Sequence, residues 1–294
     1  MSTPTAMSPL APPPPSPPPA TVGAAQAWAE RGGLPRLEAQ LLVLHSLGRD
    51  PQDRAWLLAH DDAPLDAPQW ERLHAAVRAR LDTVPMAYLL GEREFHGLRL
   101  QVDARVLDPR PDTETLVDWA LDLGPQLPPG PILDLGTGSG AIALALAHAW
   151  PEAQVWAVDR SPEALALAMS NAQRLGLALH GLVSDWFGQI TGDFALVVSN
   201  PPYIAESDPH LQALRHEPRQ ALVSGPQGLD DLQRLIRAAP AHLRDGAWLL
   251  LEHGHDQADA VCGLLREAGF AQVQSRTDLA GIRRCSGGCW SALK

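Results

Sequence analysis

Four consecutive residues, Asn200, Pro201, Pro202 and Tyr203, place one amide and one aromatic ring in a stiff turn. The apolar run at 194–199 before them is typical of a buried strand, and two prolines must end that strand because they lack N–H donors and fix φ. The amide and the ring therefore follow the C-terminal end of a strand, which is where open α/β sheets bind ligands. A rigid corner of this kind is suited to holding a planar group that carries NH2.

A glycine-rich loop follows a second apolar run and precedes a helical pattern. Its residues are Gly136, Thr137, Gly138, Ser139 and Gly140. Glycine lets the backbone turn sharply and approach a ligand closely, so the loop predicts a cofactor site. The spacing also satisfies the looser dinucleotide fingerprint G-x-G-x-x-G/A, which keeps a dehydrogenase open as an alternative. The third glycine favours a ligand that lies over the loop without a pyrophosphate.

Acidic residues and one indole extend this site along the predicted sheet. Asp159 ends the next apolar run, and a carboxylate in that position accepts hydrogen bonds from a ribose diol. Asp185 and Trp186 follow a third such run and offer a carboxylate and an indole beside an adenine-sized ring, although a tryptophan also packs well in a core. Asp134, just before the glycines, either contacts the ligand or braces the loop through a hydrogen bond, and the sequence leaves both open.

The second half of the chain alternates strand-like and helix-like segments. Apolar runs of strand length lie at 131–135, 154–158, 180–184, 194–199 and 246–252, and helical patterns lie at 141–149, 162–175, 228–240 and 256–268. Two further strands fit the tail 270–294 and predict a hairpin at one sheet edge. The alternation predicts an α/β fold with a Rossmann-like, doubly wound, mostly parallel seven-stranded sheet.

The first half of the chain predicts a different architecture. Residues 1–20 are rich in proline and predict a disordered tail. Residues 21–84 predict a small helical domain, with further helices at 53–60 and 68–81. One helical stripe of that domain is formed by Leu37, Leu41, Leu44 and Leu47.

A linker is predicted between the two halves. Residues 85–110 resemble a β-hairpin with short strands at 88–91 and 95–100. A helix then opens at 110–114, and Asp112 or Thr113 is expected to cap it.

Composition excludes several classes of protein. The net charge of −11 and the sequence pI near 5.4 argue against a large basic surface for nucleic acid. No apolar run reaches the roughly 18 residues of a membrane span, and the N-terminal residues lack the pattern of a secretory signal. The low cysteine count, with Cys285 and Cys289 in no zinc-finger spacing, indicates reduced thiols. We expect a cytoplasmic protein with no membrane, metal or direct nucleic-acid partner.

The loop 134–140, Asp159, Asp185-Trp186 and the segment 200–203 together resemble a class I S-adenosylmethionine-dependent methyltransferase. More narrowly, residues 25–294 resemble the HemK-type release-factor glutamine methyltransferases. The segments that carry the narrower resemblance are 88–95, 109–114, 207–210, 217–219 and 251–254. The proline-rich residues 1–20 lie outside the family pattern, and Asp112 stands where glutamate is more usual.

The resemblance implies methyl transfer from S-adenosylmethionine to the glutamine side-chain nitrogen in the Gly-Gly-Gln loop of peptide chain release factors. It implies that residues 111–294 form the catalytic domain and that residues 21–84 dock the substrate. Cofactor contacts are implied for the glycine loop, Asp159, Asp185, Trp186 and Asn200. Ribosomal-protein glutamine methyltransferases share most of these motifs and DNA or RNA amino-methyltransferases share Asn-Pro-Pro-Tyr, so both stay open. A cofactor-binding scaffold would not need the intact asparagine and tyrosine.

Methyl transfer to an amide nitrogen chiefly requires that the reacting atoms be aligned. An amide nitrogen is a poor nucleophile because its lone pair is delocalised, so nitrogen, methyl carbon and sulfur must be held in line without water. We expect the Asn200 side-chain oxygen and the Pro201 carbonyl to accept the two N–H bonds of the substrate amide, with Pro202 locking the turn and Tyr203 packing against the amide plane. No general base is needed beforehand, since the proton becomes acidic only as the N–C bond forms.

For several charged residues and two histidines we expect structural roles and no direct part in methyl transfer. Arg110 and Glu114 are expected to pair near the cofactor, and residues 215–219 are expected to brace the Asn-Pro-Pro-Tyr turn. His253 and His255 are expected to be solvated or satisfied in the core.

Overall fold

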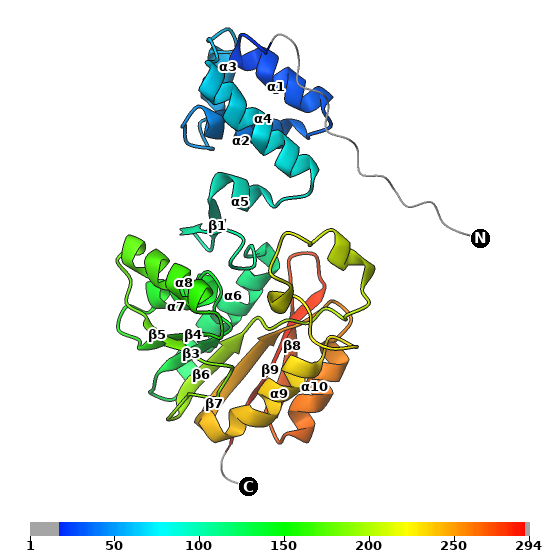
Figure 1. Ribbon diagram of the computed structural model, residues 1–294. Helices are drawn as coiled ribbons and strands as arrows, with labels where there is room; N and C mark the ends of the chain where they lie inside the picture. The colour runs from blue at the N-terminus through cyan, green and yellow to red at the C-terminus, as the bar shows by residue number, and fades with distance from the viewer. Residues whose placement is uncertain (1–17, 292–294) are drawn as a thin grey trace, which may run out of the picture. The chain divides into compact units, whose positions relative to one another are not determined.

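The computed structural model describes residues 18–291 and divides into two compact units, one up to Gly91 and one from Glu92 (Figure 1). Most of the predicted tail 1–20 lies outside the described residues, as do residues 292–294. In the described part of the chain, every helix is too short or too polar to cross a membrane.

The first unit is helical and packs around one apolar core. Its helices are α1 (Val22–Arg31), α2 (Arg36–Ser46), α3 (Arg54–Ala59), α4 (Ala67–Leu81) and α5 (Met86–Leu90). Asp66 starts α4 with a capping box, in which its carboxylate accepts from the Gln69 N–H at 2.7 Å and the Gln69 side chain accepts from the Asp66 N–H at 2.9 Å. The rings of Trp28 and Trp70 meet edge to face in this core, with centroids 4.7 Å apart.

The predicted leucine stripe of α2 is wrong in one position. Leu37 is 50% exposed. The helix instead buries Ala39, Leu42 and Val43, whose spacing of three and four residues defines the face that meets the core.

The run at 88–90 is helical and does not form the predicted strand. Pro85 precedes the helix with φ at −54°, and Gly91 ends it in the left-handed region at φ 75°, the conformation that glycine adopts at helix C-termini. Leu89 and Leu90 pack against the helical core. The hairpin begins after Gly91, where β1 (Glu92–Phe95) pairs antiparallel with β2 (Leu98–Gln101).

The second unit is an α/β domain built on one seven-stranded sheet, which confirms the predicted fold class. The strand order is β5-β4-β3-β6-β7-β9-β8. The parallel strands are β3 (Ile132–Leu135), β4 (Val155–Asp159), β5 (His180–Val183), β6 (Phe194–Ser199) and β7 (Leu243–Glu252). The predicted C-terminal hairpin is present as β8 (Ala271–Thr277) and β9 (Arg283–Cys289), and β9 pairs antiparallel with β7.

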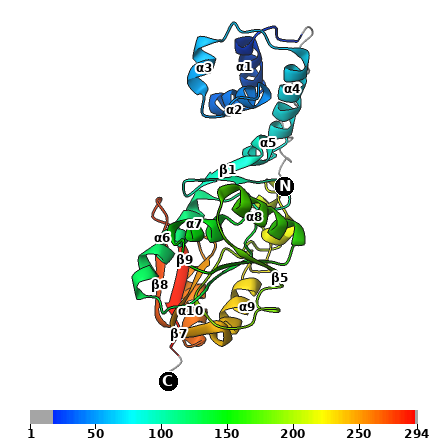
Figure 2. The same cartoon turned by 90° about the vertical axis from the view of Figure 1, so that its left-hand side faces the viewer.

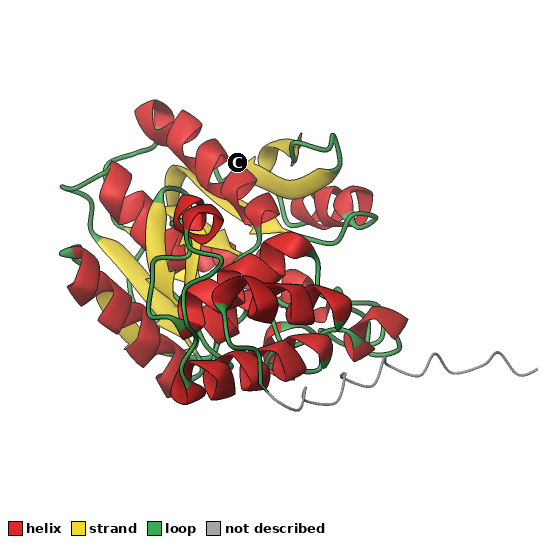
Figure 3. Ribbon diagram, turned by 90° about the horizontal axis from the view of Figure 1, so that it is seen from above, coloured by secondary structure: helices red, strands yellow, loops and turns green. Residues whose placement is uncertain are grey.

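Helices cover both faces of this sheet (Figures 1 and 3). On one face, α9 (Asp230–Ala238) and α10 (Ala258–Glu267) share a core with Leu133 and Leu135 of β3. Side chains alternate along a strand, so Asp134 points to the opposite face, where α7 (Ala141–Ala149) lies. The helices α6 (Glu114–Leu123) and α8 (Pro162–Leu175) complete the second unit, with α6 against α7 and α8 against β4 and β5.

The C-terminal ends of four parallel strands lie in register at one edge. Leu135 pairs with Val158 and Ser199, and Asp159 pairs with Val183. The chain order of the strands reverses between β3 and β6, which creates a crevice beyond the strand ends. Figure 2 views the sheet from the side of β5 and α8. The segments that follow β3, β4, β5 and β6 are therefore neighbours in space.

Candidate active site

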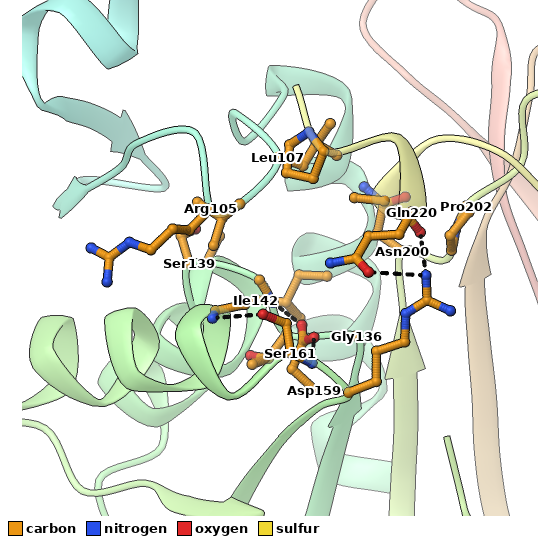
Figure 4. A pocket seen from close by; sticks show the side chains of 18 of the residues that line it. Arg105, Leu107, Gly136, Ser139, Ile142, Asp159, Ser161, Asn200, Pro202 and Gln220 are labelled. Atoms are coloured by element: carbon orange, nitrogen blue, oxygen red, sulfur yellow. Dashed lines mark hydrogen bonds between the residues drawn. The ribbon is translucent and has the colours of Figure 1, made fainter. Parts of the chain in front are cut away.

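A pocket opens at this edge of the sheet (Figure 4). The predicted site residues that line it are Gly136, Thr137, Gly138, Ser139, Asp159, Asp185, Trp186, Asn200 and Pro202. Three others, Gly140, Pro201 and Tyr203, are not among the lining residues. The fold thus brings together side chains from four separate strand ends.

The glycine loop has a backbone that other residues adopt with strain. Gly136, Gly138 and Gly140 have φ of 73°, 56° and 86°, all in the left-handed region. A Cβ at Gly136 would lie 3.2 Å from Trp186, and one at Gly140 would lie 3.1 Å from Ala168, whereas one at Gly138 would meet nothing within 4 Å. Gly136 and Gly140 are therefore required for packing, and Gly138 leaves open space beside the pocket.

Asp159 joins the glycine loop to the start of α8. Its Oδ2 atom accepts from the Gly138 N–H and its Oδ1 atom accepts from the Ser161 N–H, each at 2.9 Å. A carboxylate oxygen accepts more than one hydrogen bond, so both atoms keep the capacity to accept from a diol in the pocket.

Asp134 braces the loop from inside the protein. It is fully buried, and its Oδ2 atom accepts from the Thr137 hydroxyl at 2.7 Å and from the Ala143 N–H at 3.2 Å. Burial raises the pKa of this carboxyl to about 7, against the opposing effect of those two hydrogen bonds. Of the two roles that the sequence left open, these contacts support bracing.

Trp186 belongs to the core and to the pocket wall at once. Its side chain packs in the same cluster as α9 and α10, and its Nε1 atom donates to Asp231 Oδ1 at 3.0 Å. Asp185 beside it is exposed and forms an ion pair with Arg234 at 2.7 Å. The indole is thus held in place by packing and a hydrogen bond, while the neighbouring carboxylate is neutralised at the surface.

Asn200 turns the nitrogen end of its amide toward Thr113. The Nδ2 atom donates to Thr113 Oγ1 at 3.2 Å, and both residues line the pocket. Among the described residues none donates to Asn200 Oδ1. Thr113 was expected to cap the following helix, but it makes no side-chain capping bond, and its backbone is already helical at φ −65° and ψ −22°. The turn therefore offers an unused acceptor at the pocket.

Tyr203 is fixed by a buried carboxylate that the sequence analysis did not single out as a site residue. Its hydroxyl donates to Glu252 Oε1 at 3.1 Å. Burial and the adjacent Glu252 carboxylate raise the pKa of the phenol, so Tyr203 stays protonated. Glu252 is the last residue of β7, and burial raises its own pKa to about 7. The only sequence signal for Glu252 was the family-like segment 251–254.

An ionic cluster joins the two outer segments of the pocket, 105–109 and 218–221. Arg110 pairs with Glu217 Oε1 at 2.5 Å and with Asp108 Oδ2 at 3.3 Å. The Asp108 N–H donates to Glu217 Oε2 at 3.2 Å, and both carboxylates are buried. The cluster therefore holds in place the segment after Glu217, which lines the pocket together with the glycine loop.

The predicted pairing of Arg110 with Glu114 is wrong. Glu114 Oε1 accepts from the His96 N–H at 3.0 Å, while Arg110 turns to Asp108 and Glu217. The reason is topological, since the long connection between β6 and α9 returns to this edge and places a buried carboxylate beside the guanidinium. The Asn-Pro-Pro-Tyr turn is itself braced a few residues further along this connection, where 204 pairs with 222–224.

Several pocket residues escaped the sequence analysis. They are Arg105, Val106, Leu107, Pro109, Ile142, Arg160, Ser161, Ala164, Ser184, Pro218, Gln220 and Ala221. Arg160 donates to the Gln220 carbonyl at 3.3 Å and to its side-chain oxygen at 3.4 Å. Most of these residues lie in irregular segments whose composition carries no pattern, apart from the family-like stretches 109–114 and 217–219.

The histidines after β7 take no part in the pocket. His253 is buried, with Nδ1 2.9 Å from the Gly254 carbonyl and Nε2 2.8 Å from Ser286 Oγ, and His255 is exposed. Within residues 18–291 no group of three His, Cys, Asp or Glu side chains is arranged to hold a metal ion.

Two family models match the chain. The model described as "Methyltransferase small domain" matches residues 121–274, which include the strands that form the pocket. The model described as "PrmC N-terminal domain" matches residues 23–91, the helical unit.

Curated relatives extend over nearly the whole chain. The release factor glutamine methyltransferase of Bordetella pertussis is 50% identical over 263 residues, which are 87% of this chain and 95% of that protein. The chain belongs to the release factor glutamine methyltransferase family. Family members of that name from Xylella fastidiosa (strain Temecula1) and Escherichia coli K12 are 47% and 45% identical, and the matches cover 86% and 85% of this chain and 94% and 90% of theirs.

Solved methyltransferase structures share the fold of a large part of this family member. A methyltransferase from Pyrococcus furiosus matches with a TM-score of 0.50 at 17% identity, over 66% of this chain and 90% of that chain. The hMettl16 catalytic domain, solved with the MAT2A 3'UTR hairpin 6, matches with a TM-score of 0.53 at 18% identity, over 74% of this chain and 82% of that chain. At such identities the likeness is one of fold.

Proposed function

We propose that this protein transfers a methyl group from S-adenosylmethionine to the side-chain amide nitrogen, N5, of the glutamine in the Gly-Gly-Gln motif of peptide chain release factors. The observation that carries the proposal is the unused Asn200 Oδ1 acceptor on the wall of a pocket that also contains the glycine loop and Asp159. The names of the relatives support release factors as the substrate, and translation termination takes place in the cytoplasm.

The pocket residues fit S-adenosylmethionine. Gly138 leaves open space beside the loop, and both oxygens of Asp159, which each accept one backbone N–H, keep the capacity to accept from ribose hydroxyls. The Trp186 indole is an apolar surface suited to an adenine ring, with Asp185 next to it at the rim. When bound, the cofactor would supply an electrophilic sulfonium methyl group.

Asn200 and Pro201 would bind the substrate amide. Asn200 Oδ1 and the Pro201 carbonyl would each accept one N–H, which orients the nitrogen toward the cofactor and stabilises the positive charge that grows on nitrogen in the transition state. Alignment of this kind can supply at most about 7–11 kcal/mol of the barrier. Pro202 would hold the turn in its geometry, and it lines the pocket.

Tyr203 would close the substrate site from the other side. Its ring is partly buried against the core and its hydroxyl is anchored on Glu252, so the ring plane would be held where it can pack against the amide and exclude water. Since the phenol stays protonated, Tyr203 acts by contact and takes no proton from the substrate.

Tritiated S-adenosylmethionine tests the proposal when it is offered with one acceptor at a time: a release factor, total ribosomal protein, or nucleic acid. We expect label in the release factor, and none in a release-factor variant whose Gly-Gly-Gln glutamine is replaced by asparagine. Label in a ribosomal protein alone would assign the other glutamine substrate, and label in nucleic acid alone would place the protein with the base amino-methyltransferases, although its net charge of −11 argues against that outcome.

A further inference from the structure

Four side chains form a connected line behind the pocket. Asn200 Nδ2 donates to Thr113 Oγ1 at 3.2 Å, and Tyr203 donates to Glu252 Oε1 at 3.1 Å. The Thr113 hydroxyl lies next to the Glu252 carboxylate, and its donor interaction opposes the effect of burial on the pKa of that carboxyl. Glu252 Oε2 has no other hydrogen-bond partner among the described residues. Thr113 and Glu252 are 3% and 1% exposed, so water does not compete for these contacts. Glu252 thus touches both residues that support the substrate-binding turn.

The carboxylate sets the direction of every hydrogen bond in this line. An ionised carboxylate only accepts, so the hydroxyls of Thr113 and Tyr203 both point their protons at Glu252. A threonine hydroxyl has one proton, and once that proton is committed the oxygen accepts from its other neighbour. The neighbour must then offer Nδ2, which leaves Asn200 Oδ1 for the pocket.

Protonation of Glu252 reverses the direction of the hydrogen bonds from Glu252 through Thr113 to Asn200. A neutral carboxylic acid donates one hydrogen bond, and donation to Thr113 frees the Thr113 proton to turn toward Asn200. Thr113 then donates to the Asn200 amide, which must present its oxygen on that side. The amide therefore rotates, and its NH2 group faces the pocket. Two NH2 groups, one from Asn200 and one from a substrate amide, do not hydrogen-bond to each other.

We propose that Glu252 is a positioning residue that determines, through Thr113, which end of the Asn200 amide faces the substrate. The inference rests on the proposed function, because only a substrate that donates N–H needs Oδ1. In the ionised state Glu252 holds the turn in its acceptor form, and in the neutral state the turn loses that preference. Methyl transfer is therefore supported above the pKa of Glu252 and lost as the pH falls through it.

Four further charged or titratable groups lie around Glu252. Arg284 and Asp112 pair with each other at 3.3 Å beside it, and Cys285 stands opposite it in the β7–β9 register. Burial raises the pKa of the Cys285 thiol well above its usual value, and burial lowers the pKa of the adjacent His253 imidazole. Both shifts move away from the value of about 7 that burial gives Glu252.

Asp134 also titrates near this pH, since burial raises its pKa to about 7 as well. It braces the glycine loop, and the hydrogen bonds to its carboxylate come from Thr137 and Ala143. Substitutions at Thr113 and Glu252 therefore separate the two carboxyl groups.

The test is the pH dependence of the single-turnover rate of methyl transfer to a release factor, with saturating S-adenosylmethionine, from about pH 6 to about pH 9. The wild-type rate should rise with one inflection near 7, the value to which burial raises Glu252. Thr113→Val should lower the rate at the alkaline end by roughly 10²-fold and abolish the inflection, because the amide loses its anchor. Thr113→Ser, which keeps the hydroxyl, should retain both rate and inflection.

The pH dependence of the rate of Glu252→Gln is a second test, because glutamine does not titrate. Its rate should be low and flat across the range, close to the wild-type rate at the acid end. An unshifted inflection in Thr113→Val, full activity in Glu252→Gln, or a wild-type profile without an inflection would each overturn the proposal. A misfolded Glu252→Gln protein, seen by circular dichroism, leaves the two Thr113 variants to decide. No transfer by wild type at any pH would instead contradict the proposed function.

Discussion

The Asp159 carboxylate accepts a hydrogen bond at 2.9 Å from the backbone N–H of Gly138, and so links the end of β4 to the glycine loop after β3. This link places the proposed ribose acceptor directly beside the proposed cofactor loop. Two adjacent strands thereby contribute to one binding surface.

Asp159→Ala should weaken S-adenosylmethionine binding, because it removes a charged acceptor and the brace on Gly138. A hydrogen bond to a charged group contributes about 1.5–3 kcal/mol, which corresponds to roughly a 10- to 100-fold rise in Kd. Isothermal titration calorimetry measures this change. Glu163→Gln is the matched control, because Glu163 is an exposed carboxylate close to Asp159 in sequence that does not line the pocket; an equal loss in both variants would contradict the assignment.

Gly138→Ala and Gly140→Ala should separate ligand approach from packing. Both positions have left-handed φ, which costs a residue with a Cβ about 1–2 kcal/mol. At Gly140 the new Cβ also lies 3.0 Å from Leu144, so this variant should lose more stability in thermal denaturation. Gly138→Ala should mainly raise the Kd for the cofactor. Gly97→Ala, at φ 79° with nothing within 4 Å, controls for backbone strain; the same Kd change there would count against a cofactor role for Gly138.

Glu217→Ala should loosen the segment that covers the pocket. The substitution leaves Arg110 without its shortest ion pair and Asp108 N–H without its acceptor, and losing hydrogen bonds to a buried charged group costs roughly 1.5–3 kcal/mol. Chemical denaturation should show lower stability, and cofactor binding should weaken. Glu206→Ala, an exposed carboxylate on the same connection, should do neither. Unchanged stability and cofactor affinity in Glu217→Ala would show that the cluster does not hold this segment.

Asp134 should make the protein less stable as the pH rises toward neutrality. Burial raises the pKa of this carboxyl in the folded protein to about 7, above its ordinary value, so the folded state binds the proton more tightly than the unfolded state. The resulting stability is present at low pH and is lost as the pH rises through that value. The free energy of unfolding, measured by denaturation, should be lower at about pH 8 than at about pH 5. In Asp134→Asn this difference should be smaller, and the remainder should come from Glu252. An equal slope in the variant would assign the effect elsewhere.

The central strands of the parallel half were predictable because they are buried on both faces. The run Phe194–Ser199 has the bounds predicted for it, and Ile132–Leu135 differs by one residue at its start. Such strands form continuous apolar runs that end at glycine or proline. The start of β7 was less visible: the strand begins at Leu243, three residues before the predicted start at 246, because Arg244 and Asp245 interrupt the apolar pattern.

The site residues that follow strand ends were predictable from the sequence. The site residues held by contacts between residues far apart in the sequence were not. The glycine loop, Asp159 and Asn200 each stand directly after an apolar run, so topology alone brings them together. The contact between Arg110 and Glu217 spans 107 residues, and the contact between Tyr203 and Glu252 spans 49. Local sequence says nothing about such pairs, because each depends on how a long connection folds back on the sheet.

Asn200→Ala gives the most direct test of the central claim, that the Asn200 amide accepts from the substrate glutamine during methyl transfer. The measurement is peptide mass spectrometry of a release factor incubated with S-adenosylmethionine and either enzyme, with cofactor binding by the variant measured alongside. Wild type should add one methyl group to the Gly-Gly-Gln glutamine, and Asn200→Ala should add none while it binds cofactor nearly as wild type does. Methylation of that glutamine by a folded Asn200→Ala protein at a near wild-type rate would contradict the account.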